Sequence, residues 1–238
     1  MYQDILTIAV VTVFAFFAIY WMWFQGEVDG SRLIAKNSMK QQKFNIILVL
    51  VAAFIVKAIL AVKNEGYSVD ITCFRSWSET VFTGGLSHFY EGDVTDYPPG
   101  YMLVLWLVAA IRHLFNIDNY STTGLFMIKL FPMLFDLAAA YLIYVMAKKR
   151  FSEGMSLMLS TLYALNPAVV IDSSVWGQVD GVLCCMVLLT CYLFMEEKRI
   201  LAYFAFCAGV LLKPQMVMFA PIIIYSIIEQ VFLHDFNT

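Results

Sequence analysis

Long apolar stretches separated by short polar segments dominate the sequence. Four stretches have the length of a membrane-spanning helix, roughly 20 mostly apolar residues, and they cover residues 5–24, 45–62, 125–146 and 155–171. A fifth stretch, 181–195, is shorter but carries no charge, and the block 200–233 is long enough for two helices that meet at Lys213-Pro214. The pattern predicts an all-α, polytopic bundle of about seven transmembrane spans.

Positively charged residues predict the orientation of these spans. They cluster in three loops, at residues 32–43, 148–150 and 198–199, and the positive-inside rule places such loops in the cytoplasm. All three loops lie on one side only if the apolar stretch 100–115 does not cross the bilayer. Its Arg112 and His113 favour that choice, because burying a cation in lipid is costly. We therefore expect residues 63–124 to form one long outward loop that contains juxtamembrane helices.

The chain divides into two parts in this arrangement. Residues 1–44 hold an additional N-terminal span and the first basic cytoplasmic loop, and residues 45–238 form the membrane core. The first span is not expected to be a signal peptide, because Met1-Tyr2-Gln3-Asp4 lacks a basic residue and no small-residue cleavage site follows it.

The composition agrees with membrane insertion and excludes several classes of protein. The chain is 61% hydrophobic and 14% charged, whereas soluble domains are about 45–50% apolar and about 25% charged. A net charge of −3 provides no basic field for nucleic acid. The five cysteines show neither a metal-ligand spacing nor a disulfide framework. The three histidines are scattered, so no metal site is expected.

Carboxylates gather on the predicted outward side, next to the ends of apolar helices. The loop 63–124 holds seven Asp and Glu residues against three Lys and Arg, and the next outward segment adds Asp172 and Asp180. Topology explains the missing positive charges but not carboxylates at helix junctions. Ionisable groups inside the membrane are expensive and usually functional, and these carboxylates lie where apolar helices end. This pattern predicts a functional site at the outer boundary.

Two short strings in the first outward loop hold candidate chemistry. Asp70 follows a predicted span end, and Phe74 and Trp77 at i+4 and i+7 share its helical face. A lone Asp at such a place is more often a helix cap or a solvated loop residue. In Asp96-Tyr97-Pro98-Pro99 the prolines impose an extended approach to the next helix, which an ordinary helix start also explains.

Two further strings lie farther along the chain. Asn166-Pro167 interrupts a span, and Asp172, Trp176, Gln178 and Asp180 follow within a few residues. A kink and a turn explain the proline but not this set of polar side chains. In Lys213-Pro214-Gln215 a lysine lies at a helix break, where it either meets a phosphate or extends its ammonium to the membrane surface.

Taken in order, these strings resemble the GT-C superfamily of membrane glycosyltransferases. The likeness is greatest to the dolichyl-phosphate-glucose glucosyltransferases of the endoplasmic reticulum and to bacterial relatives that use polyprenyl-phosphate sugars. It covers about residues 45–225 and rests on Asp70 with Trp77, Asp96-Tyr97-Pro98-Pro99, Leu125-Phe126-Met127, Asp136, Asn166-Pro167, Ile171-Asp172, Gln178, and Lys213 near Gln215. The resemblance implies a GT-C fold with its active site on the extracytoplasmic face.

The resemblance also implies a reaction: transfer of a hexose, with inversion, from a polyprenyl-phosphate sugar to an extracytoplasmic glycan or lipid-linked acceptor. It places Asp70 as general base. The expected substrate-binding residues are Trp77, Asp96, Tyr97, Asp172, Trp176, Gln178, Asp180, Lys213 and Gln215, with Arg75 and Lys129 as second choices for the donor phosphate. No cofactor and no essential metal are expected. The expected partners are the bilayer, the donor and the acceptor, and the expected location is a bacterial plasma membrane.

Other readings of the chain stay open at this point. Asp136 lies inside a predicted span, with Lys129 two turns earlier as the expected partner or, equally, a hydrogen bond to another helix. Together with Lys57 and the broken helices it also fits a secondary transporter, which predicts inverted repeats that this sequence does not show. Members of the superfamily commonly run longer, so the chain is either a minimal core or a non-catalytic piece without the C-terminal acceptor-binding part.

Overall fold

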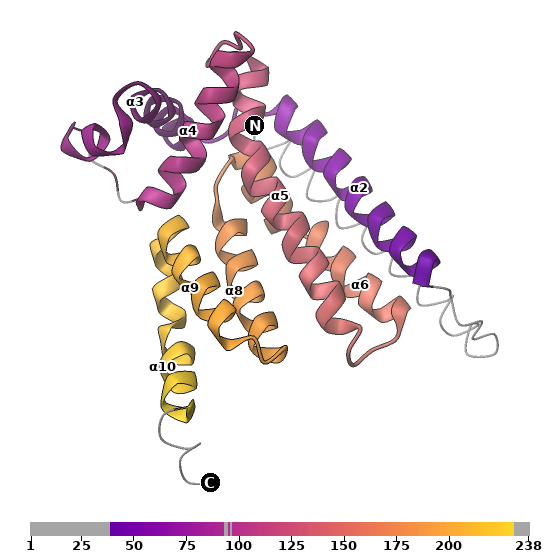
Figure 1. Cartoon of the computed structure of the whole chain (residues 1–238). Helices are drawn as coiled ribbons and strands as arrows, with labels where there is room; N and C mark the ends of the chain where they lie inside the picture. Colours follow the sequence, from indigo (N-terminus) through magenta and orange to yellow (C-terminus); the bar gives the residue numbers. More distant parts are fainter. Residues whose placement is uncertain (1–38, 93–94, 96, 231–238) are drawn as a thin grey trace.

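The computed structural model describes residues 39–92, 95 and 97–230, and every regular element in this part of the chain is helical. Two long helices, α2 (Met39–Lys63) and α5 (Thr122–Ala147), lie side by side with α6 (Glu153–Ala164) packed against both. On the other side of α5, α8 (Asp180–Met195) packs against α5 and α9 (Arg199–Leu212). The described residues therefore form the predicted all-α bundle (Figure 1).

Four short helices follow α6 and α9. Between α6 and α8 run α7 (Pro167–Val170) and the π-helix η1 (Ile171–Trp176). After α9 come the 3₁₀ helix η2 (Pro214–Phe219) and α10 (Ala220–Ile228). Asn166 begins α7 by accepting a hydrogen bond from the amide of Ala168 at 2.9 Å. The breaks predicted at the two proline-containing strings are therefore real breaks in the chain direction.

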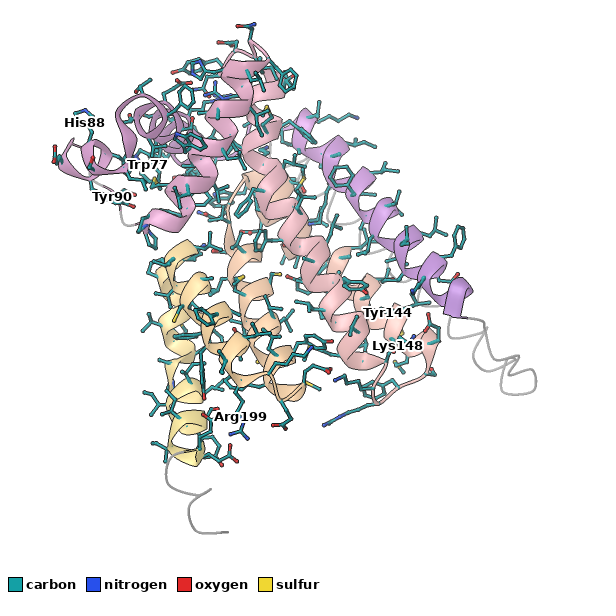
Figure 2. All side chains as sticks on the ribbon, viewed as in Figure 1. Trp77, His88, Tyr90, Tyr144, Lys148 and Arg199 are labelled. Atoms are coloured by element: carbon teal, nitrogen blue, oxygen red, sulfur yellow. The ribbon has the colours of Figure 1, made fainter. Side chains whose placement is uncertain are left out.

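The long loop predicted between the first two core spans contains α3 (Ser68–Gly92) and α4 (Pro99–Leu114). Both lie at one end of the bundle, where α2 ends and α5 begins (Figure 1). Figure 2 shows Trp77 of α3 at this end, whereas Lys148 and Arg199 lie near the opposite end. The helix at 100–115 thus shares its end of the bundle with α3, as the distribution of basic residues required.

Helix lengths do not confirm seven spans. The described residues contain two helices long and apolar enough to cross a membrane, Lys43–Lys63 and α5. They contain a third span if α6 and the segment Pro167–Trp176, bent by 46°, count as one. With 16 and 14 residues, α8 and α9 are shorter than a full span. The sequence analysis did not predict η2, which takes up the first six residues after Lys213. Neither half of the block 200–233 is therefore a long α-helix. The predicted span 5–24 lies outside the described residues.

A buried cation joins α3 to α4. Arg112 is only 2% exposed and forms an ion pair with Glu79 of α3, while His113 Nε2 lies 3.0 Å from the other oxygen of this carboxylate. Burial alone raises the pKa of Glu79, but the bonds from Arg112 and His113 outweigh it, so this pKa lies below its ordinary value. The sequence argument concerned the cost of placing Arg112 in lipid; the structure buries it inside the protein, against a carboxylate partner.

The largest apolar core cluster attaches α3 and α4 to the rest of the bundle. It includes Phe74 of α3, Tyr101 of α4, Ile128 of α5 and Val182 of α8, all nearly inaccessible. The approach of α4 to α9 is close: a Cβ at Gly100 would lie 2.5 Å from the carbonyl oxygen of Leu211. This packing places the first turns of α3 over the beginning of α8 and the end of α9. The candidate site lies there.

Candidate functional site

A cavity of about 420 Å³ opens where α3 meets the beginnings of α8 and η2. Its lining residues are Asp70, Cys73, Phe74, Trp77, Tyr97, Gln178, Asp180, Lys213, Pro214 and Gln215. Apart from Cys73, Phe74 and Pro214, each of these is one of the predicted catalytic or substrate-binding residues. The fold therefore gathers most of the predicted site residues from four separate strings into one cavity.

Two side chains, one from the last residue of η1 and one from the segment after it, hold the carboxylate of Asp70 by one oxygen. Trp176 Nε1 donates to Asp70 Oδ2 at 2.9 Å, and Gln178 Nε2 donates to the same oxygen at 3.1 Å. Gln178 is fixed in turn, because its Oε1 accepts from the Tyr97 hydroxyl and from the amide of Val179, both at 2.9 Å. Among the described residues, no donor contacts Asp70 Oδ1. That oxygen remains available to accept a hydrogen bond from a ligand.

Aromatic rings form one wall of the cavity. The Trp77 ring lies 5.9 Å from that of Phe74 and 5.7 Å from that of Tyr97, measured between centroids. Tyr101 supports this wall from α4, 5.1 Å from Tyr97 and 5.3 Å from Phe74. Such a wall offers an apolar face beside the carboxylate, which suits a ring with both polar and apolar surfaces.

The opposite part of the cavity contains a cation. Lys213 lies at the break between α9 and η2, is 5% exposed, and pairs with the carboxylate of Asp180. The Asp180 side chain is 58% exposed, so the pair joins a buried ammonium to a carboxylate near solvent. An anionic group that enters the cavity would compete with Asp180 for this ammonium.

Comparison with known proteins identifies the family. Residues 96–236 match the family of dolichyl-phosphate-mannose-protein mannosyltransferases. The chain belongs to this family. It is also 27% identical over 128 residues to GPI mannosyltransferase 1 of Saccharomyces cerevisiae (strain ATCC 204508 / S288c), a match that covers 51% of this chain and 29% of that relative. No solved structure matches the chain.

Membership confirms that the protein is a GT-C superfamily member, and with the apolar helices it identifies an integral membrane protein. The matched family and the matched yeast protein are both named mannosyltransferases. The short strings had instead suggested the glucosyltransferase branch of the same superfamily. The family match begins at residue 96 and so includes the strings around Gln178 and Lys213 but not Asp70. The chain spans less than a third of the curated relative's length.

Two of the predicted substrate-binding residues, Trp176 and Asp172, do not line the cavity. Trp176 lies beside it and contacts Asp70 through its indole N–H. Asp172 is half-buried in η1, and its backbone oxygen accepts from the amides of Gly177 and Gln178, both at 2.9 Å. Asp172 thus shapes the turn that carries Gln178 towards Asp70. Asp96 lies outside the described residues.

The two second-choice cations also lie away from the cavity lining. The guanidinium of Arg75 lies over the Tyr120 ring, 5.2 Å from its centroid. Lys129 is completely buried in α5, where its ammonium donates to backbone carbonyls, the shortest of these bonds being 2.7 Å to Asn64. Neither is placed to meet a phosphate in this cavity. The i+5 spacing from Asp70 puts Arg75 on a different face of α3.

Of the two alternatives for Asp136, the pairing with Lys129 is wrong and the hydrogen bond to another helix is confirmed. Asp136 Oδ2 accepts from Lys57 Nζ of α2 at 2.8 Å, and the two side chains are 1% and 0% exposed. Lys57 also donates to the carbonyl of Val169 and to the Ser173 hydroxyl, each at 3.1 Å. This family member therefore has a buried ion pair that connects two span-length helices to the broken span.

Sequence reasoning missed Lys57 as a partner and Cys73 as a lining residue, although it placed Phe74 on the helical face of Asp70. The i+3 position of Cys73 gave the same signal, because positions i+3 and i+4 share a helical face with position i. No such signal exists for Lys57, which lies on a different helix from Asp136 and 79 positions away.

Proposed function

We propose that this protein transfers a hexose from a polyprenyl-phosphate-linked sugar to an extracytoplasmic glycan or lipid-linked acceptor, with inversion at the anomeric carbon. The observation that carries this proposal is the Asp70 carboxylate, held through Oδ2 by Trp176 and Gln178 in a cavity that also contains the buried ammonium of Lys213. Both names that the comparisons supply make mannose the first sugar to test.

The reaction is one displacement at the anomeric carbon. The acceptor hydroxyl donates a hydrogen bond to Asp70 Oδ1, and its oxygen attacks the anomeric carbon as the bond to the phosphate oxygen breaks. The hydroxyl proton passes to Asp70, and the electron pair of the broken bond stays on the departing polyprenyl phosphate. A phosphate is a good leaving group, so one carboxylate base is the minimum protein requirement.

Lys213 and Asp180 divide the recognition of the donor between them. The negative charge on the phosphate grows as the bond breaks, and the Lys213 ammonium stabilises that charge. Once the phosphate takes this ammonium, the Asp180 carboxylate is released to accept hydrogen bonds from sugar hydroxyls. Trp77 and Tyr97 provide a stacking face for the sugar ring.

The active site is proposed to face away from the cytoplasm. Trp77, which lines the cavity together with Asp70, lies at the end of the bundle opposite Lys148 and Arg199 (Figure 2), and basic loops mark the cytoplasmic side. The donor's lipid chain would stay in the bilayer while its phosphate and sugar reach the cavity at the boundary. We propose a bacterial plasma membrane as the location.

The test of this function compares cells that lack the gene with the same cells after rescue. Mass spectrometry of their surface glycans and lipid-linked oligosaccharides should show the loss of one hexose increment, restored by the wild-type gene. Purified protein in nanodiscs should consume polyprenyl-phosphate mannose faster than the glucose donor when membrane extract supplies the acceptor. An unchanged glycan profile together with no donor consumption would favour a transporter or a non-catalytic GT-C-like partner.

Lys213→Met should weaken use of the donor. Removing a hydrogen bond to a charged group costs about 1.5–3 kcal/mol, so kcat/KM for the donor should fall about 10- to 150-fold. The fall should include a higher KM and, because Lys213 stabilises the charge that grows on the phosphate, a lower kcat. Initial rates over a range of donor concentrations measure this effect. Lys198→Met, in an exposed loop at the other end of the bundle, is the matched control. An unchanged kcat/KM for the donor in Lys213→Met would contradict the phosphate role.

Transfer should continue at the same rate in excess EDTA. A monophosphate donor presents no pyrophosphate whose charge requires a divalent ion, and we propose that Lys213 is sufficient for this leaving group. The measurement is the initial transfer rate with and without the chelator. Loss of activity that Mg²⁺ or Mn²⁺ restores would show that a metal takes part.

A further inference from the structure

Lys129 is surrounded by backbone carbonyl oxygens deep inside the bundle. Its Nζ donates to Ala61 at 3.4 Å and Asn64 at 2.7 Å near the end of α2, and to Ser174 at 3.0 Å and Val175 at 3.3 Å in η1. The side chain is 0% exposed. An ammonium has only three N–H donors, so these four carbonyls already use all of its hydrogen-bonding capacity.

These carbonyls belong to two helix ends that need a donor. The last carbonyls of α2 have no partner within their own helix, and η1 is a π-helix that ends at Gly177 with a positive φ of 88°. An unpaired carbonyl in a water-poor interior costs several kcal/mol. Lys129 therefore stabilises both ends and, because one atom serves both, holds them together.

The two ends carry the groups that meet in the Asp70 contact. The segment 174–178, here called the Trp176 arm, supplies Trp176 and Gln178, which both donate to Asp70. The end of α2 leads directly into α3, whose first turn holds Asp70. A further bond, from the amide of Tyr67 to the carbonyl of Trp176 at 2.9 Å, joins the same two segments closer to the site.

Close packing supports the same connection. Gly177, within the Trp176 arm, lies against the lysine stem, and a Cβ there would be 3.2 Å from Lys129 Cε. Lys129 does not line the cavity, so its route to the site runs through the arm and not through a ligand.

We propose that Lys129 is a positioning residue that fixes the Trp176 arm against the start of α3 and thereby orients the Asp70 carboxylate towards the acceptor hydroxyl. This inference rests on the proposed transferase function for its catalytic consequence. Its structural part, the dependence of the Trp176–Asp70 contact on Lys129, does not.

The structural part is tested on the indole N–H of Trp176. The full chain is labelled with ¹⁵N-tryptophan in nanodiscs, and Trp176→Phe assigns the resonance. Lys129→Met should shift or broaden this resonance, whereas Lys63→Met, at an exposed lysine at the end of α2, should leave it in place. Lys129→Gln keeps two N–H donors on a shorter side chain, so it should shift the Trp176 resonance less. If Lys129→Met does not fold, Lys129→Gln is the variant that is compared with wild type. An unmoved Trp176 resonance in the folded Lys129 variants would overturn the proposal.

The catalytic part is tested by the division between kcat and KM. Displacement of a catalytic group by about 1 Å costs on the order of 100-fold in rate, so Lys129→Met should lower kcat by about 10- to 100-fold with the donor KM within about 2-fold of wild type. A raised donor KM, as expected for Lys213→Met, would instead make Lys129 a phosphate ligand and overturn the proposal. If the wild-type protein transfers no sugar while the resonance moves as expected, the proposed function fails and the positioning contact stands.

Discussion

Asp70→Asn should reduce hexose transfer by about 10²- to 10⁴-fold, the range that a positioned general base contributes. The amide is the same size as the carboxylate, and its oxygen still accepts from Trp176 and Gln178, so the fold and the cavity should persist. What the amide lacks is the basicity to take the acceptor proton. The measurement is the initial transfer rate of the purified variant at a saturating donor concentration, together with the donor KM, which should change little.

Glu65→Gln is the matched control for this prediction. Glu65 is an exposed acid in the same loop, five positions before Asp70, and its neutralisation should leave transfer unchanged. In cells, wild-type protein should restore the missing hexose and Asp70→Asn should not, at equal expression on a blot. Full activity of Asp70→Asn would reduce Asp70 to an acid in the first turn of α3, where it interacts favourably with the helix dipole.

Lys57→Met should cause a large loss of stability. The substitution leaves the Asp136 carboxylate buried at 1% exposure without its cation, and breaking a buried pair in this way typically costs about 3–5 kcal/mol. It also removes the donor to the Val169 carbonyl and the Ser173 hydroxyl. Thermal unfolding in detergent, followed by fluorescence-detected size-exclusion chromatography, measures the effect as a lower midpoint.

A double variant separates the lost pair from the lost packing. Lys57→Met combined with Asp136→Leu removes both charges, and such apolar replacements of buried pairs are often neutral or stabilising. The double variant should therefore recover most of the stability that the single variant loses, and Lys63→Met should unfold like wild type. Equal stability of the single and double variants would show that the unpaired carboxylate is not the source of the loss.

The buried pair also bears on the transporter reading. Asp136 and Lys57 drew attention in the sequence as ionisable groups inside spans, where such residues commonly mark a transport path. In the described structure each is nearly inaccessible and their charges satisfy one another, and Lys57 further holds the broken span through Val169 and Ser173. Their arrangement has the character of a structural connection between helices.

Some features of the site followed from local sequence alone. The position of Asp70 relative to Phe74 and Trp77 depends on helical periodicity, which a single segment specifies. The chain breaks at Asn166-Pro167 and Lys213-Pro214 follow from proline chemistry, and both appear in the structure. The side of the bundle on which α4 lies followed from the distribution of basic residues.

Other features depend on how helices pack, and the sequence arguments about them were wrong or incomplete. Seven spans were expected because hydropathy measures apolar length, and it does not distinguish the 3₁₀ turns of η2 from a continuous α-helix. Lys129 was considered as a phosphate ligand and as the partner of Asp136 because only its own helix was visible. Its actual partners are carbonyls of α2 and η1, 45 to 68 positions away.

The sequence by itself determined the helical, membrane-embedded character of this protein, its family, and the strings that carry its polar chemistry. These properties reside in composition, in periodicity and in short motifs that each lie within one segment. Only the tertiary structure decided which ammonium pairs with which oxygen: Lys213 with Asp180, Lys57 with Asp136, and Lys129 with backbone carbonyls. The physical reason is that a buried lysine must be satisfied by whatever polar atom the packing brings within about 3 Å, and that neighbour comes from another helix.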